Sequence, residues 1–345
     1  MNERTTYNSL DLGKFICAIL IILLHTAPFA SYSSVLTYGF RNIISVVAVP
    51  FFFMTSGFLF FAKANTLTKE EQQRYIIKYL KRLGVMYLIW TAVYFPFVLY
   101  GWMHNGATWI DVLQYVKRFF FEGSYSTIWF LPALMTAVAT VYLLSRKLKM
   151  DTIVWIAIPF YLFACMGSSY YGLAKGIPVL RELVHGYYAF FGTVKNGLLF
   201  GFLYVTLGGW LAKKKVEVSQ KRLLWQSVIL FLLLTGETVL QTVLRWSSKG
   251  VDIKLVLAPL SVVLFVAILS VKLSDAPIYV WMRKMSLLLF LSQRIFISLF
   301  DLFLSNTILV TNSMLYCVCV LLLTIGFSYG FIRISNKMPW LKKFY

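Results

Sequence analysis

Three ionisable residues near the start of the chain have types and a spacing suited to chemistry inside a membrane. Asp11 and Lys14 are three residues apart, and His25 closes the uncharged run that follows Lys14. On a helix, the eleven steps from Lys14 to His25 cover about 16 Å and return to nearly the same face. Because an imidazole titrates near neutral pH, we predict His25 as a base. The Asp11–Lys14 pair either binds an anionic ligand, with Lys14 contacting the cofactor, or its two side chains simply bind each other. For His25 the structural alternative is a hydrogen bond to the neighbouring backbone.

Other polar residues interrupt apolar stretches later in the chain. Glu237 lies midway through one such stretch, Gln293 and Arg294 lie inside another, and Asp301 follows on roughly the same face as Arg294. Ionisable groups at membrane depth are costly and usually mark a substrate path or a reaction centre. An arginine keeps its charge and binds phosphate or carboxylate. We therefore predict substrate binding by Glu237 and Gln293 and cofactor binding by Arg294. A structural pairing of Arg294 with Glu237 or Asp301 is the alternative.

Three short motifs add further candidates. Ser56 and Gly57 form a small pair inside an aromatic helix, which allows either close helix packing or a ligand. Trp129 begins a Trp-Phe-Leu-Pro element, and Lys195 begins a Lys-Asn-Gly element that contains Asn196. An interfacial tryptophan is usually a belt residue, so each motif alone is a weak signal. We predict substrate binding by Ser56, Trp129 and Asn196 and cofactor binding by Lys195.

The elements that must position these residues are membrane helices. The chain of 345 residues is 59% hydrophobic and 13% charged, which leaves too little polar surface for a soluble domain. Its repeated apolar runs predict an all-α fold, a polytopic membrane helix bundle that forms a single domain over residues 1–345. The ten expected spans are about 12–30, 43–62, 83–102, 128–145, 152–167, 197–212, 222–243, 255–271, 285–304 and 308–332. Residues 168–196 form a long connection, too apolar to be simply solvated, that we expect to fold back over a site.

The charge distribution indicates orientation rather than nucleic-acid binding. The net charge is +20, but the basic residues lie in short loops between spans and concentrate on alternate loops. We therefore expect a multi-pass protein of the bacterial cytoplasmic membrane with both termini in the cytoplasm, the lipid bilayer as its partner and no nucleic acid. The four cysteines fall in apolar stretches and the three histidines are far apart, so we expect neither disulfides nor a metal site.

Together these motifs resemble those of the acyltransferase-3 family of ten-span membrane proteins. The family opens with Asp-x-x-Arg-x10-His and continues with Phe-x-x-Ser-Gly-Phe, Trp-Phe-Leu-Pro and Arg-Asn-Gly elements. The matching positions are Asp11, Lys14, His25, Phe53, Ser56, Gly57, Phe58, Trp129 to Pro132, and Lys195 to Gly197. The resemblance implies Asp11 and His25 as catalytic residues and an acyl-CoA donor, acetyl-CoA first of all. In three positions the chain departs from the family: Lys14 and Lys195 replace arginines, and Gln293 replaces a frequent histidine.

Within the family, the chain is most similar to the membrane part of VanT-type serine racemases of vancomycin resistance. The similarity runs through Val49 to Gly57, Trp129 to Leu134 and Gly192 to Gly197. It implies that a cytoplasmic racemase domain dependent on pyridoxal phosphate follows in the full-length parent. The residues present here would themselves hold no pyridoxal phosphate and racemise nothing.

Three functions remain open from the sequence. The first is transfer of an acyl group from cytoplasmic acyl-CoA to a hydroxyl acceptor, with His25 as base. The second is L-serine uptake that feeds a linked racemase, in which an intramembrane cation and anion bind the two ends of the amino acid. The third is a membrane anchor whose sites have degenerated.

Overall fold

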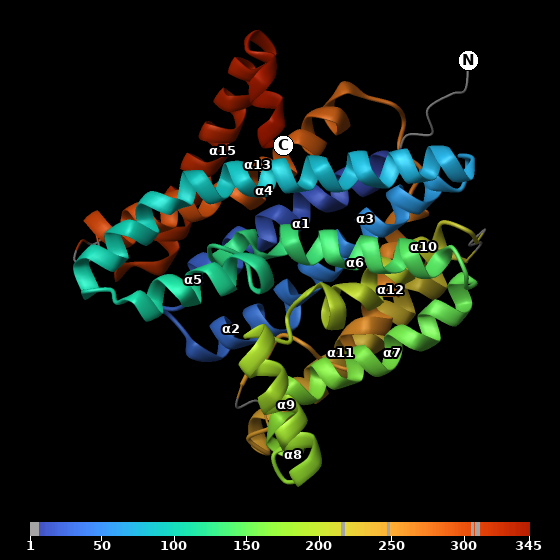
Figure 1. The fold of residues 1–345 in the computed structure, drawn as a ribbon, viewed down its shortest axis with the longest axis horizontal. Coiled ribbons are helices and arrows are strands. Elements are labelled where there is room, and N and C mark those ends of the chain that lie inside the picture. Colours follow the sequence, from blue (N-terminus) through green and yellow to red (C-terminus); the bar gives the residue numbers. More distant parts are fainter. Residues whose placement is uncertain (1–6, 215–217, 247–248, 305–306, 308–310) are drawn as a thin grey trace. The chain divides into compact units, whose positions relative to one another are not determined.

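The computed structural model describes residues 7–214, 218–246, 249–304, 307 and 311–345, and in these ranges every regular element is a helix (Figure 1). The predicted all-α class is confirmed. The chain divides into two compact units. Unit 1 is Met1–Phe52, Val218–Ile229 and Ser261–Tyr345, and unit 2 is Phe53–Glu217 and Leu230–Leu260. Each unit is described by itself, and the single-domain prediction stays a prediction.

Each of the ten expected spans overlaps an apolar helix, and residues 308–310 of the tenth lie outside the described residues. In the described ranges, eight helical segments are long and apolar enough to cross a membrane, and two apolar helices are shorter. The eight are Asn8–Thr26, Ser34–Ala64, Lys69–Asn105, Ser126–Ser145, Met150–Gly167, Gln220–Val243, Pro277–Phe303 and Ser313–Lys337, and the two are Gly197–Leu211 and Leu257–Leu269. The chain is therefore a multi-pass membrane protein by helix length and composition.

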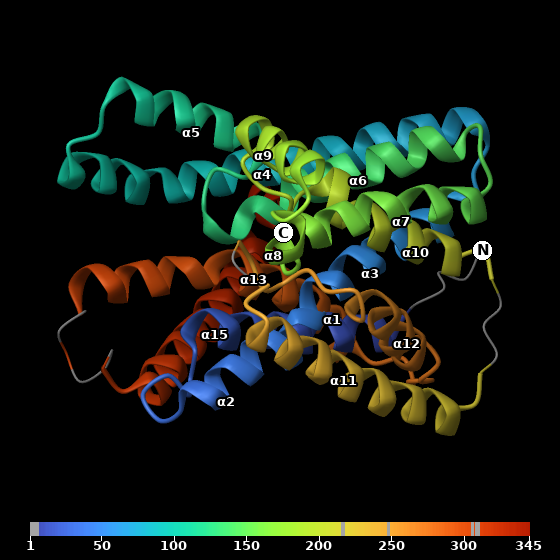
Figure 2. The same cartoon turned by 90° about the horizontal axis from the view of Figure 1, so that it is seen from below.

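Unit 1 is built on three helices that pack against one another: α1 (Asn8–Thr26), α13 (Pro277–Phe303) and α15 (Ser313–Lys337) (Figures 1 and 2). Helix α1 ends where Ala27 adopts a left-handed φ of 46° and Pro28 follows. Helix α13 begins with Pro277, whose fixed φ suits the first helical turn.

Hydrogen bonds fix the directions of these helices. At the start of α1, Asn8 donates to Asp275 (2.7 Å), which lies just before α13, so α1 and α13 begin at the same end of the unit. Ser313, at the start of α15, donates to the carbonyl of Pro28 (2.8 Å), just after α1, so α15 runs in the opposite direction. Positions equally far from the starts of α1 and α13 therefore lie at similar heights in unit 1.

The rest of unit 1 consists of short pieces. Helix α2 (Ser34–Gly39), a π-helical turn η1 (Phe40–Ile44) and a 3₁₀ turn η2 (Ser45–Val47) lead into α3 (Ala48–Ala64). The 3₁₀ turn η5 (Pro339–Phe344) follows α15. The chain passes from one unit to the other within α3, α11 (Gln220–Val243) and α12 (Leu257–Leu269).

Unit 2 begins with the rest of α3 and the long helix α4 (Lys69–Asn105). A capping box between Thr68 and Glu71 starts α4, and Gly106, with φ of +66°, ends it. Helix α5 (Trp109–Phe121) folds back along α4 (Figure 2). The remaining elements are η3 (Ser126–Trp129), α6 (Phe130–Ser145), α7 (Met150–Gly167), α8 (Tyr171–Ala174), α9 (Pro178–Phe191), η4 (Gly197–Gly201) and α10 (Phe202–Leu211).

Two glycines let α3 and α10 approach closely in unit 2. A Cβ atom added at Gly57 would lie 2.3 Å from the carbonyl oxygen of Val205, and one added at Gly208 would lie 2.1 Å from that of Met54. Small residues at such crossings allow backbone contact between membrane helices. The close-packing interpretation of the Ser-Gly motif thus has direct support for Gly57.

The outer surface of α11 is suited to lipid. Its exposed side chains are predominantly large and apolar, namely Leu224, Trp225, Val228, Ile229, Leu232, Leu233, Val239, Leu240 and Val243. An apolar face of this extent in water would be strongly unfavourable, whereas acyl chains solvate it. The bilayer is therefore a partner of the chain.

Candidate functional site

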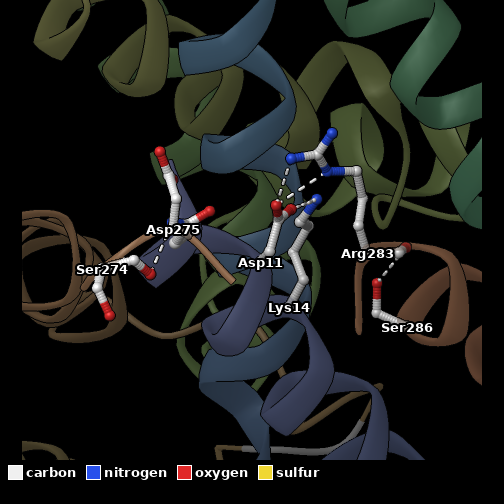
Figure 3. A network of polar contacts seen from close by, with 7 residues as sticks. Asp11, Lys14, Ser274, Asp275, Arg283 and Ser286 are labelled. Atoms are coloured by element: carbon white, nitrogen blue, oxygen red, sulfur yellow. Dashed lines mark hydrogen bonds and ion pairs between the residues drawn. The ribbon is translucent and has the colours of Figure 1, made fainter. Parts of the chain in front are cut away.

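The carboxylate of Asp11 binds two cations at the start of α1. Lys14 lies 2.7 Å from Oδ1, and the Nη2 and Nε atoms of Arg283 on α13 donate to Oδ2 over 2.6 and 2.9 Å (Figure 3). The side chain of Asp11 is 3% exposed, that of Lys14 14% and that of Arg283 49%. We call these three residues the Asp11 cluster. Asp11 and Lys14 thus bind each other, as one of the two alternatives held, and the cluster keeps one net positive charge.

Sequence reasoning missed Arg283. The ninth span was expected to begin near residue 285, which placed Arg283 in a basic loop, whereas α13 begins at Pro277. Arg283 therefore projects from the helix, and Ser286 one turn later bonds its carbonyl oxygen (2.9 Å, Figure 3). A signal was present, because Pro277 is a typical first residue of a helix.

His25 and Arg294 occupy a second level of unit 1. His25 follows Lys14 by eleven residues in the last turn of α1, and Arg294 follows Arg283 by eleven residues on the parallel helix α13. Eleven helical steps cover about 16 Å and rotate by nearly three full turns. Each residue therefore leaves its helix on nearly the same face as the corresponding member of the Asp11 cluster. Both lie about 16 Å further along the unit, and we call this pair the His25 level.

Buried polar atoms without partners lie on α13 at this level. The Nε atom of Arg294 and the Oε1 atom of Gln293 are buried and have no hydrogen-bond partner among the described residues. The side-chain amide of Gln293 donates to Phe290 (3.1 Å). Nearby, the hydroxyl of Tyr316 on α15 donates to Asp301 (3.3 Å) and interacts electrostatically with Arg294. A buried donor and a buried acceptor left open cost free energy unless a ligand or water occupies them.

In unit 2, Glu237 is held by its own chain. Among the described residues, four groups donate to its carboxylate: the Tyr170 hydroxyl (2.6 Å), the backbone N–H groups of Leu255 (2.7 Å) and Val256 (3.0 Å), and the Gln241 amide (3.2 Å). These bonds tie α11 to the segment that enters α12. The negative charge of Glu237 is thus stabilised by donors rather than left bare in an apolar helix.

A buried lysine, which the sequence reasoning also missed, lies beside Glu237. Lys254 is fully buried, and its carbonyl accepts a hydrogen bond from Tyr161 (2.7 Å). Burial lowers the pKa of Lys254 to about 8, although the charges of Glu237 and Asp252 act in the opposite direction. From the sequence it resembled an ordinary basic loop residue, and no local signal distinguishes it.

The Lys-Asn-Gly element has two different tasks in unit 2. The side chain of Asn196 caps η4 by accepting from the N–H groups of Leu198 and Leu199 (3.1 Å each). The ammonium group of Lys195 forms an ion pair with Asp252 and lies 5.3 Å from the centre of the Trp129 ring. Lys195 and Trp129, two predicted site residues, are therefore neighbours.

A pocket of about 500 Å³ lies beside Lys195 and Trp129, entirely within unit 2. We call it the unit 2 pocket. Its walls combine aromatic rings with charges of both signs. The lining residues are Val98, Trp102, Asp111, Gln114, Tyr115, Arg118, Glu122, Gly123, Ser124, Tyr125, Ser126, Trp129, Thr193 and Lys195.

The long connection contacts Glu237 and also bonds Asn196, a predicted site residue at its own end; that it folds over a site stays a prediction. It contains α8 and α9, and its Tyr170 bonds Glu237 while its Tyr187 bonds the Asn196 amide (2.6 Å). Burial, and then the neighbouring Glu237, raise the pKa of Tyr170 well above its usual range, so it stays a donor. Ser56, the remaining candidate in this unit, is hydrogen-bonded with Tyr79.

The predicted site residues therefore fall into two groups. Unit 1 holds Asp11, Lys14, His25, Gln293 and Arg294, and unit 2 holds Ser56, Trp129, Lys195, Asn196 and Glu237. The described ranges contain no group of three or more His, Cys, Asp or Glu side chains able to hold a metal ion. The cysteines at positions 17, 165, 317 and 319 are free thiols.

Comparison with known proteins gives a family and several relatives. The family model of the acyltransferase-3 type, described as an acyltransferase domain, matches residues 7–333. An amino-acid racemase of Enterococcus faecalis is 30% identical over 241 residues, which cover 69% of this chain and 32% of that protein. A serine/alanine racemase of Enterococcus gallinarum is 27% identical over 337 residues, which cover 96% of this chain and 47% of that protein.

The chain thus spans about a third to a half of the length of these relatives. No solved structure matches it significantly.

Proposed function

Because the chain belongs to the acyltransferase-3 family, we propose that it transfers an acyl group from cytoplasmic acyl-CoA to a hydroxyl acceptor, with His25 as the base. The observation that supports this most is the pair of polar levels in unit 1. A cationic cluster and an imidazole–guanidinium level lie about 16 Å apart on parallel helices. A donor with phosphates at one end and a thioester at the other needs such a separation.

The Asp11 cluster fits the phosphate end of the donor. Lys14 and Arg283 supply two cations, and Asp11 holds both in place while cancelling one charge. The half-exposed guanidinium of Arg283 is available to solvent and to ligands. Guanidinium and ammonium groups are the usual protein partners of phosphate. In this proposal Asp11 positions the cations rather than reacting, since the fourteen helical steps between Asp11 and His25 cover about 21 Å.

His25 would act at the thioester. Its neutral imidazole takes the proton of the acceptor hydroxyl while the hydroxyl oxygen bonds to the acyl carbon. The carbon–sulfur bond breaks, and the imidazolium returns the proton to the leaving thiolate. Arg294, with its buried open Nε donor, is suited to bind the acyl oxygen or to orient the donor, and Gln293 offers an open acceptor beside it.

The unit 2 candidates are given no step in this chemistry. Trp129 and Lys195 line the unit 2 pocket, whereas Asn196 and Glu237 hold the segments around it. The bonds of Glu237 to its own chain favour a supporting role over direct substrate contact. Ser56, bonded with Tyr79, keeps its predicted role as a proposal.

The test is thiol release from acetyl-CoA by the protein reconstituted in liposomes. His25→Ala should abolish release, whereas His104→Ala should leave it unchanged. His104 is a matched control because it is exposed and stacks on Tyr100 at the end of α4. Release that persists in His25→Ala, or that falls equally in both variants, would contradict the assignment.

L-serine uptake is the second candidate. Two relatives are named amino-acid racemase and serine/alanine racemase, and Arg294 lies near Asp301 and Tyr316 in unit 1. A guanidinium and a carboxylate are the partners that the two ends of an amino acid require. Radiolabelled L-serine that accumulates in the same liposomes without thiol release would establish uptake. If neither signal appears, the remaining function is a membrane anchor for a linked racemase.

A further inference from the structure

The unit 2 pocket carries two cations. Arg118 comes from α5, and Lys195 comes from the segment before η4. Asp252 and the Trp129 ring already hold the Lys195 ammonium group, whose side chain is 33% exposed. An ammonium group has three N–H donors, so a bond to Asp252 leaves donors for a second carboxylate.

The same pocket carries two carboxylates, Asp111 and Glu122, in different surroundings. Asp111 accepts from the N–H and the hydroxyl of Thr108 (2.7 Å each), and these bonds, together with the charge of Arg118, hold its pKa below the usual range. Asp111 is thus committed to capping α5. Glu122 lies against Gly192, where an added Cβ would stand 1.8 Å from its Oε1 atom. The glycine, with φ of +72°, leaves the space that the Glu122 carboxylate occupies.

Charges of both signs in one cavity select a class of ligand. A polyanion would meet Asp111 and Glu122, a cation would meet Arg118 and Lys195, and an apolar molecule would desolvate all four. A zwitterion satisfies both signs at once. The aromatic walls of the pocket, which include Trp102 and Trp129, also attract an ammonium group.

We propose that the unit 2 pocket binds a zwitterionic ligand, a free amino acid or a short peptide, whose carboxylate contacts Arg118 and Lys195 and whose ammonium group contacts Glu122. The volume of about 500 Å³ lies within the range of small-molecule sites, roughly 300–1,000 Å³. It admits a peptide of two residues as well as a single amino acid. This site goes beyond the proposed function, since binding requires neither His25 nor acyl-CoA.

The test is equilibrium binding to the full chain in lipid nanodiscs. Radiolabelled L-serine, L-alanine and L-alanyl-L-alanine are the zwitterionic probes, and N-acetyl-L-serine and L-serine methyl ester are competitors that lack one charge. We expect saturable binding of at least one zwitterion and at least tenfold weaker competition by both blocked analogues. Preference for the dipeptide or for the single amino acids identifies which source of zwitterion the pocket takes.

Variants locate the site. Arg118→Gln and Glu122→Gln should each weaken binding about tenfold or more, and Glu122→Asp should restore part of it. Lys117→Gln is the matched control on the same helix, because Lys117 bonds the carbonyl of Ala189 and does not line the pocket. Melting temperatures of all variants verify folding.

Two results would overturn the site: no saturable binding of any zwitterionic probe, or binding that survives in both Arg118→Gln and Glu122→Gln. His25→Ala separates this site from the proposed chemistry. Binding that persists in His25→Ala without thiol release in any variant would support the pocket and reject acyl transfer. Thiol release without zwitterion binding would support acyl transfer and reject the zwitterion site.

Discussion

Replacement of Asp11 by asparagine tests the cluster on which donor binding would depend. Asp11→Asn keeps the size of the side chain but removes the negative charge between Lys14 and Arg283. Removing one partner of a buried ion pair costs about 3–5 kcal/mol. The Lys14 side chain is only 14% exposed, so its pair with Asp11 is close to this fully buried case. The Arg283 side chain is 49% exposed and screened by solvent, so its pair with Asp11 contributes about 1 kcal/mol or less to the free energy of unfolding. We therefore expect a loss of about 2–4 kcal/mol in the free energy of unfolding.

Thermal unfolding in detergent measures this loss. At roughly 2 °C per kcal/mol for a chain of this size, Asp11→Asn should lower the melting temperature by about 4–8 °C. Asp275→Asn is the control, because exposed Asp275 accepts from the neutral amide of Asn8 at the same end of the unit, and it should change the melting temperature by less than about 2 °C.

The order of the variants is the sharper criterion. Lys14→Met should cost less than Asp11→Asn, because Asp11 keeps its two bonds from Arg283. The double variant should cost less than the sum of the two, since removal of Lys14 relieves the cation that Asp11→Asn leaves unpaired. A melting temperature unchanged in Asp11→Asn, or a larger loss in Lys14→Met, would refute the electrostatic reasoning.

Three further outcomes are expected. Because the pKa of Lys254 is about 8 in the folded protein against 10.5 as its ordinary value, the unfolded chain binds more protons between these values; stability should rise by up to about 3 kcal/mol from pH 8 to 10.5, and Lys254→Met should flatten that rise in melting temperature. Gly57→Ala should destabilise by about 1–3 kcal/mol or more, because its Cβ would meet the backbone of Val205, whereas Gly236→Ala, with nothing within 4 Å, should not; melting temperatures compare them. Glu237→Gln should cost about 1–3 kcal/mol, because an amide cannot accept at both positions from Leu255 and Val256, and equal melting of variant and parent would contradict this.

Hydropathy located the helices but not their polar ends. The span expected at 83–102 is the apolar part of α4, which starts at Lys69 after its capping box. The charged first section of α4 has low hydropathy, so an apolar run does not include it. The Thr68–Glu71 spacing, typical of a capping box, does predict the start of the helix. The same effect hid Arg283, because the first turns of α13 are less apolar than its middle.

The partners of Glu237 show a different limit. Its position inside an apolar helix was evident from the sequence, and so was its need for a partner. The partners are a tyrosine of the long connection and two backbone N–H groups that precede α12. Backbone donors carry no sequence signature, and contacts between distant segments arise only when the helices pack. Lys254 was hidden for the same reason, since tertiary burial alone separates it from an ordinary loop lysine.

The two eleven-residue intervals show what the structure adds to the motif. The sequence alone shows that Lys14 and His25 lie on one face of a helix. Arg283 and Arg294 are separated by the same eleven residues, but the sequence alone does not connect the two pairs. Because Arg283 binds Asp11 and the two helices run in parallel, the second interval is aligned with the first. A cation of α13 therefore lies at the height of the α1 lysine at one level and at the height of the α1 histidine at the other. With Lys14 in place of the family's arginine, the bidentate contact of a guanidinium with Asp11 is not lost, since Arg283 supplies it to the same carboxylate.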